Sequence, residues 1–249
     1  MAQLTFLGTG SATDFEMGQT SLIYRGSATI LIDCGPQTPV AFTRTRPDPD
    51  ALDAVYITHR HGDHCFGIGA LLLWLRLARR EKPLTLAAES GTLEYLKQLL
   101  DIGYGGAFLP SKCFPIKYVG FSANEPLCVS STVLSIAETA HNVPNCALRI
   151  EDSGLLTAIS GDGLVTAQTS KLYEGCDYIV QECAYFTHDH PNHMNVERVV
   201  AVAEALSPKH LMVTHCIAEE RACVERALTE RLGAMVTFPR AGDQVRLSD

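Results

Sequence analysis

The feature that most constrains the fold of this chain is a cluster of His59, His61, Asp63 and His64 within six positions. The cluster follows the apolar run 54–58, which predicts a short buried strand. Imidazole nitrogen and carboxylate oxygen are ligands that borderline divalent metals such as Zn²⁺ prefer. The sequence therefore predicts a metal-binding loop at the end of a buried strand. A polar turn formed by chance is the alternative interpretation.

The spacing within this loop indicates how its side chains point. Residues two apart in an extended segment face the same way, so we expect His59, His61 and Asp63 to converge. We expect the side chain of His64 to point in another direction, because the next helix starts there.

Three further candidate ligands follow apolar strands elsewhere in the chain: His141, Asp162 and His215. Buried strands of α/β folds place site residues at their ends. Taken alone, each of these residues is equally well explained as a hydrogen-bonded loop residue. Together with the cluster they supply enough ligands for two metals.

Apolar periodicity predicts strands punctuated by helices in both halves of the chain. The expected strands are 3–7, 21–24, 29–32, 54–58, 84–88, 116–119, 132–138, 146–151, 155–160, 178–181, 211–214, 236–238 and 244–247. The expected helices are 67–79, 91–100, 196–206 and 219–232. This pattern favours two packed sheets with helices outside, in an α/β or α+β arrangement. No linker or repeat interrupts residues 1–249, which predicts a single domain.

Composition narrows the class of protein. The net charge of -8 excludes a general nucleic-acid binder with a basic face. The clearest basic cluster, which spans 76–82, is interpreted as a solvated helix end rather than a binding patch. Nine cysteines without a CxxC pair indicate reduced thiols. With no signal peptide visible and no apolar run long enough to span a bilayer, we expect a cytoplasmic protein that does not enter a membrane.

The HxHxDH pattern at 59–64, followed by a distant His, Asp and His at strand ends, resembles the metallo-β-lactamase superfamily. Segments 6–11 (FLGTGS) and 31–35 (LIDCG) resemble it too, so the resemblance runs nearly end to end. It implies an α/β fold, a four-layer αβ/βα sandwich of two mixed sheets flanked by helices, formed by one metallo-β-lactamase-like domain over 1–249. It also implies two divalent metal ions, zinc or alternatively manganese, at one edge between the sheets.

The resemblance assigns each candidate ligand to a metal. The first metal would be held by His59, His61 and His141. The second metal would be held by Asp63, His64 and His215, with Asp162 bridging both. Two metals held in this way lower the pKa of a shared water toward neutrality, which gives a bridging hydroxide for attack on phosphorus or carbonyl carbon. We expect Asp63 to accept a hydrogen bond from that water and to act as proton acceptor.

Within the superfamily, the sequence is similar to ribonuclease Z and related phosphodiesterases. Glu182, at the end of a short buried strand, and His193, at the start of a helix, resemble two of their motifs. Those enzymes usually have His where Gln181 stands, and small hydroxyl-bearing residues where Met194 and Asn195 follow the second His. The resemblance implies that His193 stabilises or protonates the departing oxygen and that Glu182 fixes its other ring nitrogen.

The same residues allow other interpretations. His193 alternatively caps or packs a helix, with Glu182 as an exposed charge at a strand end. His188 and His190 lie near His193 and form a substrate rim, an adventitious metal site or simply part of a loop. Four aromatic residues between the two halves line the substrate pocket or pack in the core: Tyr104, Phe108, Phe114 and Phe121.

The expected function is a dinuclear-metal phosphodiesterase acting on a small-molecule or short nucleotide phosphodiester. Only 20 residues separate His141 from Asp162, where ribonuclease Z carries its tRNA-clamping arm, so we do not expect tRNA as a substrate. The first alternative is a hydrolase of a thioester, lactone or other carboxylic ester. The second is a non-catalytic metal-binding scaffold. A homodimer is compatible with the sequence, which does not fix the oligomeric state.

Overall fold

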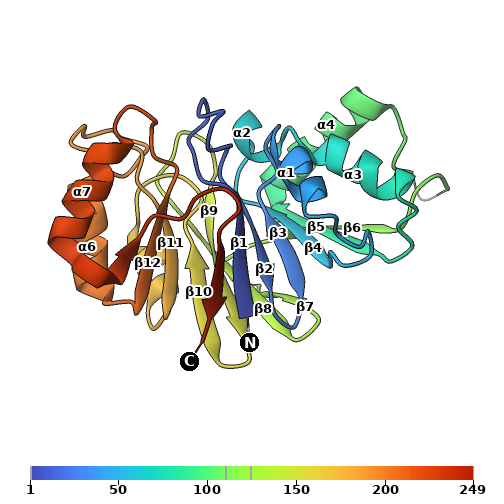
Figure 1. Cartoon of the computed structure of the whole chain (residues 1–249). Coiled ribbons are helices and arrows are strands. Elements are labelled where there is room, and N and C mark those ends of the chain that lie inside the picture. Colours follow the sequence, from blue (N-terminus) through green and yellow to red (C-terminus); the bar gives the residue numbers. More distant parts are fainter. Residues whose placement is uncertain (1, 110, 124, 249) are drawn as a thin grey trace.

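The computed structural model describes residues 2–109, 111–123 and 125–248. Its strands form two seven-stranded sheets that pack face to face (Figure 1). The first sheet has the order β14-β1-β2-β3-β4-β5-β6 and the second the order β13-β12-β11-β10-β9-β8-β7. The first sheet comprises β1 (Ala2–Gly8), β2 (Ser21–Arg25), β3 (Thr29–Ile32), β4 (Ala54–Ile57), β5 (Leu84–Glu89), β6 (Ile116–Phe121) and β14 (Gln244–Leu247). The second comprises β7 (Leu127–Val129), β8 (Thr132–Glu138), β9 (Cys146–Asp152), β10 (Leu155–Ile159), β11 (Tyr178–Glu182), β12 (His210–Thr214) and β13 (Val236–Thr237).

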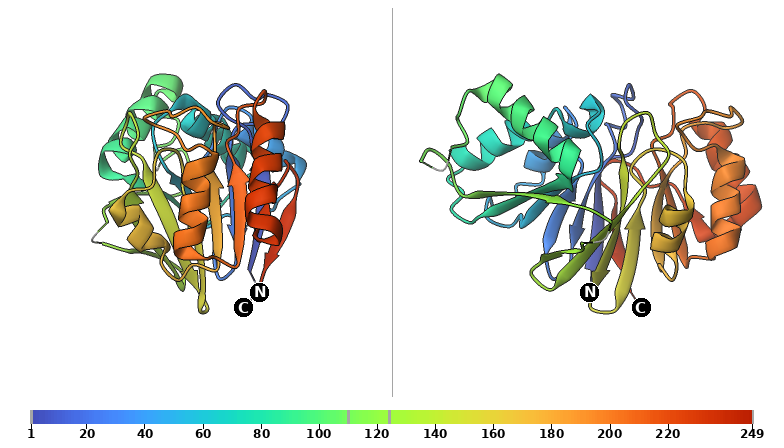
Figure 2. Two further views of the ribbon diagram at one scale, coloured as in Figure 1. Left: turned by 90° about the vertical axis from the view of Figure 1, so that its left-hand side faces the viewer. Right: turned by 180° about the vertical axis from the view of Figure 1, so that it is seen from behind.

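Helices cover the outer face of each sheet, which completes four layers (Figure 2). On the first sheet lie α1 (Thr38–Arg44), α3 (Ile68–Leu77) and α4 (Ser90–Tyr104), with the short α2 (Gly62–Cys65) at its edge. On the second lie α5 (Ala167–Tyr173), α6 (Val196–Leu206) and α7 (Arg221–Leu232), followed by the 3₁₀ turn η1 (Gly233–Met235). The predicted α/β four-layer sandwich of two mixed sheets is confirmed.

Three hydrophobic clusters hold these layers together. One fills the space between the sheets, and one lies under the helices of each sheet. Strand β4 contributes to the inter-sheet cluster and to the helix-side cluster of the first sheet, because all its residues are buried. Ala54 and Tyr56 face the inter-sheet cluster, while Val55 and Ile57 face the helices. Strands buried on both faces read as continuous apolar runs rather than alternating ones, as this one does.

The two halves repeat one pattern of strand directions. In each sheet the strands pair antiparallel on one side and parallel on the other. The parallel strands are β3 to β6 in the first sheet and β10 to β13 in the second. Parallel strands present their carboxyl ends at the same edge of a sheet, and open α/β sheets place ligand sites there. The start of β1 and the end of β14 lie at the opposite edge (Figure 1).

The structure decides between the alternatives for the four aromatic residues and corrects the interpretation of the basic cluster. Tyr104, Phe108 and Phe114 pack in the helix-side cluster and Phe121 packs between the sheets, so these aromatics serve the core rather than a pocket. The basic cluster is not a solvated helix end throughout, because Arg80 is buried and donates to backbone carbonyl oxygens.

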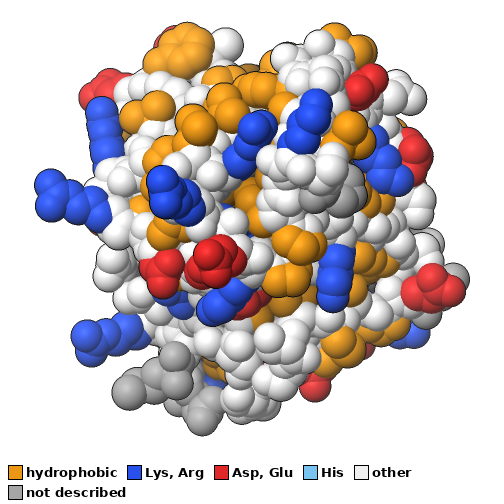
Figure 3. Space-filling model, turned by 90° about the vertical axis from the view of Figure 1, so that its right-hand side faces the viewer, with side chains coloured by type: hydrophobic (Ala, Val, Ile, Leu, Met, Phe, Trp, Pro, Cys, Tyr) orange, Lys and Arg blue, Asp and Glu red, His pale blue; other side chains and the backbone are white. Residues whose placement is uncertain are grey.

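The outer face over the helices of the first sheet carries hydrophobic side chains interspersed with lysines and arginines (Figure 3). None of the helices in the described part of the chain is long and apolar enough to cross a membrane.

Candidate metal centre

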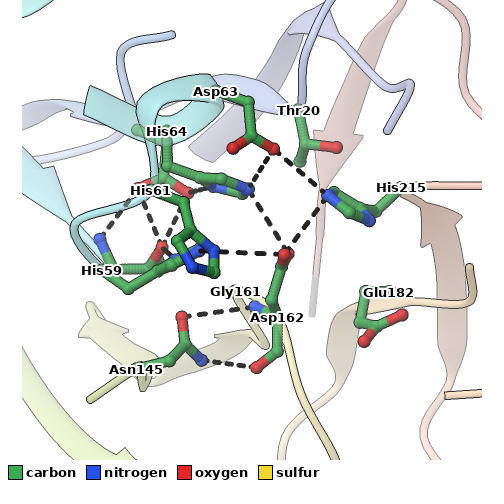
Figure 4. Close-up of polar contacts among 12 residues, drawn as sticks. Thr20, His59, His61, Asp63, His64, Asn145, Gly161, Asp162, Glu182 and His215 are labelled. Carbon is green, nitrogen blue, oxygen red and sulfur yellow. Dashed lines mark hydrogen bonds and ion pairs between the residues drawn. The ribbon is translucent and has the colours of Figure 1, made fainter. Parts of the chain in front are cut away.

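The predicted ligands converge at the edge where the parallel strands end (Figure 4). Their ligand atoms form two groups, within each of which all atoms lie within 4.8 Å of one another. The first group consists of His59, His61, His141 and Asp162. The second consists of Asp63, His64 and His215. The structure therefore brings all seven predicted ligand residues together, from four segments that are far apart in the sequence.

The first group is compact. His61 Nδ1 lies 3.0 Å from His59 Nε2 and 3.2 Å from His141 Nε2. Asp162 Oδ2 lies 3.8 Å from His59 Nε2. Three imidazoles and one carboxylate oxygen that point at a common centre match the donor set that zinc binds in proteins.

Asp162 also reaches the second group. Its Oδ1 lies 3.4 Å from His64 Nε2 and its Oδ2 lies 3.3 Å from His215 Nε2. Asp63 Oδ2 lies 3.3 Å from the same His64 nitrogen and 3.7 Å from that of His215. The carboxylate of Asp162 thus forms ion-pair contacts with histidines of both groups.

The expectation that Asp63 points with His59 and His61 is wrong. His61 is the last extended residue of the loop, with φ −63° and ψ 147°, and α2 begins at Gly62. Because a helical turn follows, Asp63 leaves the direction of the two histidines and pairs with His64 instead. The split between the groups agrees with the assignment implied by the resemblance.

Buried atoms without hydrogen-bond partners test whether this site fits cations. Among the described residues, His64 Nε2, Asp162 Oδ1 and His215 Nε2 are buried and have no hydrogen-bond partner. Native structures leave few buried polar atoms unpaired. A cation bound between these nitrogen and oxygen atoms would give each of them a partner, so the residues present fit divalent metal binding.

Three residues that the sequence analysis did not single out hold the ligand rings in place. Asp33 Oδ2 lies 2.7 Å from His64 Nδ1, and Asn192 O lies 2.9 Å from His141 Nδ1. Thr58 Oγ1 lies 3.0 Å from His59 Nδ1. Such outer contacts fix the tautomer and the orientation of a ligating imidazole. Asp33 follows β3 just as Asp162 follows β10. This position after a buried strand is the sequence signal that could have identified Asp33 as a site residue.

The turn that carries Asp162 is fixed by side chains of the neighbouring strand ends. Thr139 Oγ1 donates to Asp162 O at 2.6 Å, and Asn145 bonds both the N–H and the carbonyl of Asp162. Gly161 adopts φ +62°, and a Cβ there would lie 2.8 Å from Asn145 Oδ1. Glycine is required at this position because the backbone is left-handed and the space is filled.

The electrostatics of the site favour an ionised Asp162 and neutral His59 and His141, whereas nearby carboxylates favour the protonated form of His64. Burial lowers the pKa of His59 well below its usual value and that of His141 to about 4. Burial alone would raise the pKa of Asp162, but His215 and His64 hold it well below its ordinary value. Burial also opposes protonation of His64, whereas the carboxylates of Asp162 and Asp33 raise its pKa well above 6.5. Neutral imidazole and ionised carboxylate are the forms that bind metals.

Glu182 and His193 lie beside the two groups. His193 Nδ1 is 3.1 Å from Glu182 Oε1, and its ring stacks on His215 with centroids 5.5 Å apart. Glu182 is fully buried and also accepts from the backbone N–H groups of Gly163, Met194 and Ala184. The alternative of an exposed strand-end charge is therefore wrong. A ligand atom of His193 lies within 4.8 Å of ligand atoms of Asp162 and His215.

The remaining histidines and cysteines near the site do not join these groups. Among residues 2–109, 111–123 and 125–248, the candidate ligand groups contain only His and Asp, and neither His188 nor His190 belongs to one.

Comparisons with known proteins identify relatives of the whole chain. The sequence profile of the family described as "Anti-Pycsar protein Apyc1" matches residues 2–227. A ribonuclease Z of Mycobacterium sp. (strain KMS) is 25% identical over 280 aligned positions, which cover 100% of this chain and 94% of that enzyme. The metallo-β-lactamase fold protein YhfI from Bacillus subtilis superimposes with a TM-score of 0.83 at 19% identity, covering 98% of both chains.

A second ribonuclease Z has a higher identity over a shorter match. The ribonuclease Z of Aeropyrum pernix is 33% identical over 101 residues, which cover 39% of this chain. The match spans only 33% of the length of that enzyme. The predicted likeness to the metallo-β-lactamase superfamily and to ribonuclease Z is confirmed by these relatives.

Proposed function

The chain belongs to the Apyc1 family of anti-Pycsar proteins, within the metal-dependent hydrolases of the metallo-β-lactamase superfamily, and we propose that it is a dinuclear-metal phosphodiesterase. We propose a small or single-stranded phosphodiester as its substrate. The observation that carries this function is the position of His193, which Glu182 holds beside both candidate ligand groups.

The two ligand groups would each hold one divalent cation, for which we propose zinc, with manganese as the alternative. His59, His61 and His141 would bind the first ion, and Asp63, His64 and His215 the second, with Asp162 contacting both. When bound, such ions activate a water molecule and stabilise negative charge that develops on the phosphoryl oxygens.

Two side chains would move protons during hydrolysis. The carboxylate of Asp63 is more accessible than that of Asp162, with exposed fractions of 15% and 3%. It is therefore the one that the attacking water reaches, and it accepts the proton of that water. His193 binds Glu182 through Nδ1, which leaves Nε2 to stabilise or protonate the departing oxygen.

The size of the substrate follows from the segment between His141 and Asp162. That segment is occupied by the β9–β10 hairpin, whose strands are joined at residues 153 and 154. A protruding arm to clamp a folded RNA has no place in a turn of this length. The net charge of -8 also disfavours a long polyanion. The ribonuclease name of the relatives supports phosphodiesters as the class of bond cleaved.

The test is turnover of a substrate panel by metal-loaded protein. We expect hydrolysis of bis(p-nitrophenyl) phosphate in preference to a lactone and a thioester. His193→Ala should lower kcat by about a hundredfold or more, because the departing oxygen loses its proton donor. His210→Ala, at the far end of β12 from His215, is the matched control and should retain full activity. Turnover of the lactone or thioester alone would replace the phosphodiesterase assignment with a carboxylic ester hydrolase.

A further inference from the structure

Three aromatic side chains that the proposed chemistry does not use gather next to His193. They are Tyr185, His188 and His190, here called the aromatic rim. The rings of Tyr185 and His190 stack with centroids 5.2 Å apart and planes at 23°. His188 meets Tyr185 edge-on at 5.0 Å. His190 lies 5.2 Å from His193, so ring contacts run without a break from the candidate metal centre to the rim.

The backbone that carries the aromatic rim is held in one conformation. Arg198 donates to His190 O at 2.7 Å and forms an ion pair with Asp189. Asn195 Nδ2 donates to His188 O at 3.3 Å, and Tyr185 N donates to the carbonyl of the residue after His193. A surface that is already ordered loses little conformational entropy when a ligand binds to it.

The aromatic rim differs from a core cluster in its exposure. His188 is exposed and Tyr185 and His190 are half-buried, whereas the histidine ligands His59, His64 and His215 are buried. The rim therefore offers ring surface to solvent beside His193. Metal binding does not explain it, since neither rim histidine joins a ligand group in the described part of the chain.

We propose that the aromatic rim is a subsite that stacks the nucleobase of a nucleotide substrate whose phosphodiester lies at the metal centre. Planar bases stack on Tyr and His rings, and the flat faces of these rings select aromatic over alkyl groups. A ribose separates base from phosphate in a nucleotide, as the ring of His193 separates the rim from the candidate ligands. The subsite depends on the proposed function, because only a phosphodiesterase would bring a nucleotide to this centre.

Calorimetry with the metal-loaded full chain tests the subsite through binding rather than turnover. The ligands are adenosine 5′-monophosphate and ribose 5-phosphate, which share sugar and phosphate and differ in the base. The wild type should bind the nucleotide about tenfold more tightly. Tyr185→Ala and His190→Ala should reduce that preference to less than about twofold, with the affinity for ribose 5-phosphate unchanged.

Two variants serve as controls for this experiment. Tyr185→Phe keeps the ring and should keep the preference. His210→Ala removes a histidine from a similar stack, in which Tyr178 and His210 lie 5.0 Å apart at the other end of the sheet, and should also keep it. Equal affinity of the wild type for both ligands, no binding of either, or a preference that survives both alanine substitutions would overturn the subsite. Hydrolysis of bis(p-nitrophenyl) phosphate, measured in parallel, reports separately on the proposed function.

Discussion

Glu182 shows how much one buried residue organises at this site. Its carboxylate accepts three backbone N–H groups and lies in hydrogen-bond contact with His193. A carboxylate can accept all of these bonds, whereas an amide cannot, because its nitrogen is itself a donor. The side chain therefore positions the loop before α6 and the ring of His193 at the same time.

Glu182→Gln should therefore lower both stability and activity. We expect the free energy of unfolding in urea to fall by about 1–3 kcal/mol, because buried N–H groups lose their acceptor. In a His193→Ala background, Glu182→Gln should lower kcat much less than in the wild type, since both residues act as a unit. Fully additive losses of kcat would show that Glu182 acts independently of His193.

Asp33 makes the corresponding contact on the metal side, at 2.7 Å from His64 Nδ1. Asp33→Asn should weaken binding of the metal by about 10–100-fold, measured by competition with a chromogenic zinc chelator. Asp53→Asn is the matched control, because Asp53, just before β4, accepts the backbone N–H of Thr29 at the start of β3, away from the ligands. Unchanged zinc affinity in Asp33→Asn would contradict the role assigned to this carboxylate.

The motif residues could be predicted from the sequence because a dense cluster and isolated polar residues after apolar runs are local signals. Asp33, Asn145 and Asn192 were missed because their role depends on pairing with residues that are distant in the chain. The predicted direction of Asp63 was also wrong. Helix α2 begins at Gly62, so Asp63 is helical and does not continue the extended loop.

At the scale of elements, long periodic segments such as β8 and α6 could be predicted, whereas α1, α5 and β7 were not. Helix α1 carries Pro and Thr residues with low helix propensity, and it is held by packing against its sheet. Helix α5 has only seven residues and β7 only three, too few for a periodic pattern. Local propensity does not determine such short elements; tertiary contacts do.

Asp152 at the end of β9 joins the two sheets. It accepts from Tyr24 Oη at 3.0 Å and from the backbone N–H of Ser27 at 2.6 Å, both in the first sheet or its β2–β3 turn. Burial alone would raise the pKa of Asp152, but the hydrogen bonds from Ser27 lower it below its ordinary value. The ionised carboxylate therefore stabilises the folded state above the unfolded pKa of about 3.9.

Asp152→Asn should consequently destabilise the protein by an amount that depends on pH. The difference in unfolding free energy from the wild type should be constant above about pH 5 and should shrink as the pH falls through the folded pKa. Urea unfolding of both proteins at several pH values, in the presence of a chelator, measures this difference. A difference that stays constant down to pH 2 would show that the ionised carboxylate contributes nothing.

At the scale of the whole molecule, the order of the strands within each sheet was not predictable, because it depends on pairings between distant segments. The composition of the two halves indicated only layers of strands and helices. The resemblance to a superfamily supplied the four-layer arrangement, which the structure confirms. The position of the candidate ligands at one edge of the two sheets depends on this four-layer arrangement, and no single segment of the sequence determines it.

Metal binding should couple to the stability of the whole fold. The site draws ligands from both sheets, and several of its buried atoms have no hydrogen-bond partner in the part of the chain that the structure describes. A ligand that binds only the folded state stabilises it by about 4 kcal/mol at a concentration of 1,000 times its Kd. Removal of metal with a chelator should therefore lower the Tm, and zinc should restore it. An identical Tm with and without the chelator would contradict this coupling.

The most direct measurement is a metal titration of metal-depleted protein, followed by hydrolysis of bis(p-nitrophenyl) phosphate. Zinc and manganese are titrated in parallel. If the two ligand groups each hold one ion and act together, the rate rises until about two equivalents of an activating metal have been added and then stays constant. A plateau after one equivalent, or no hydrolysis with either metal, would contradict a dinuclear phosphodiesterase.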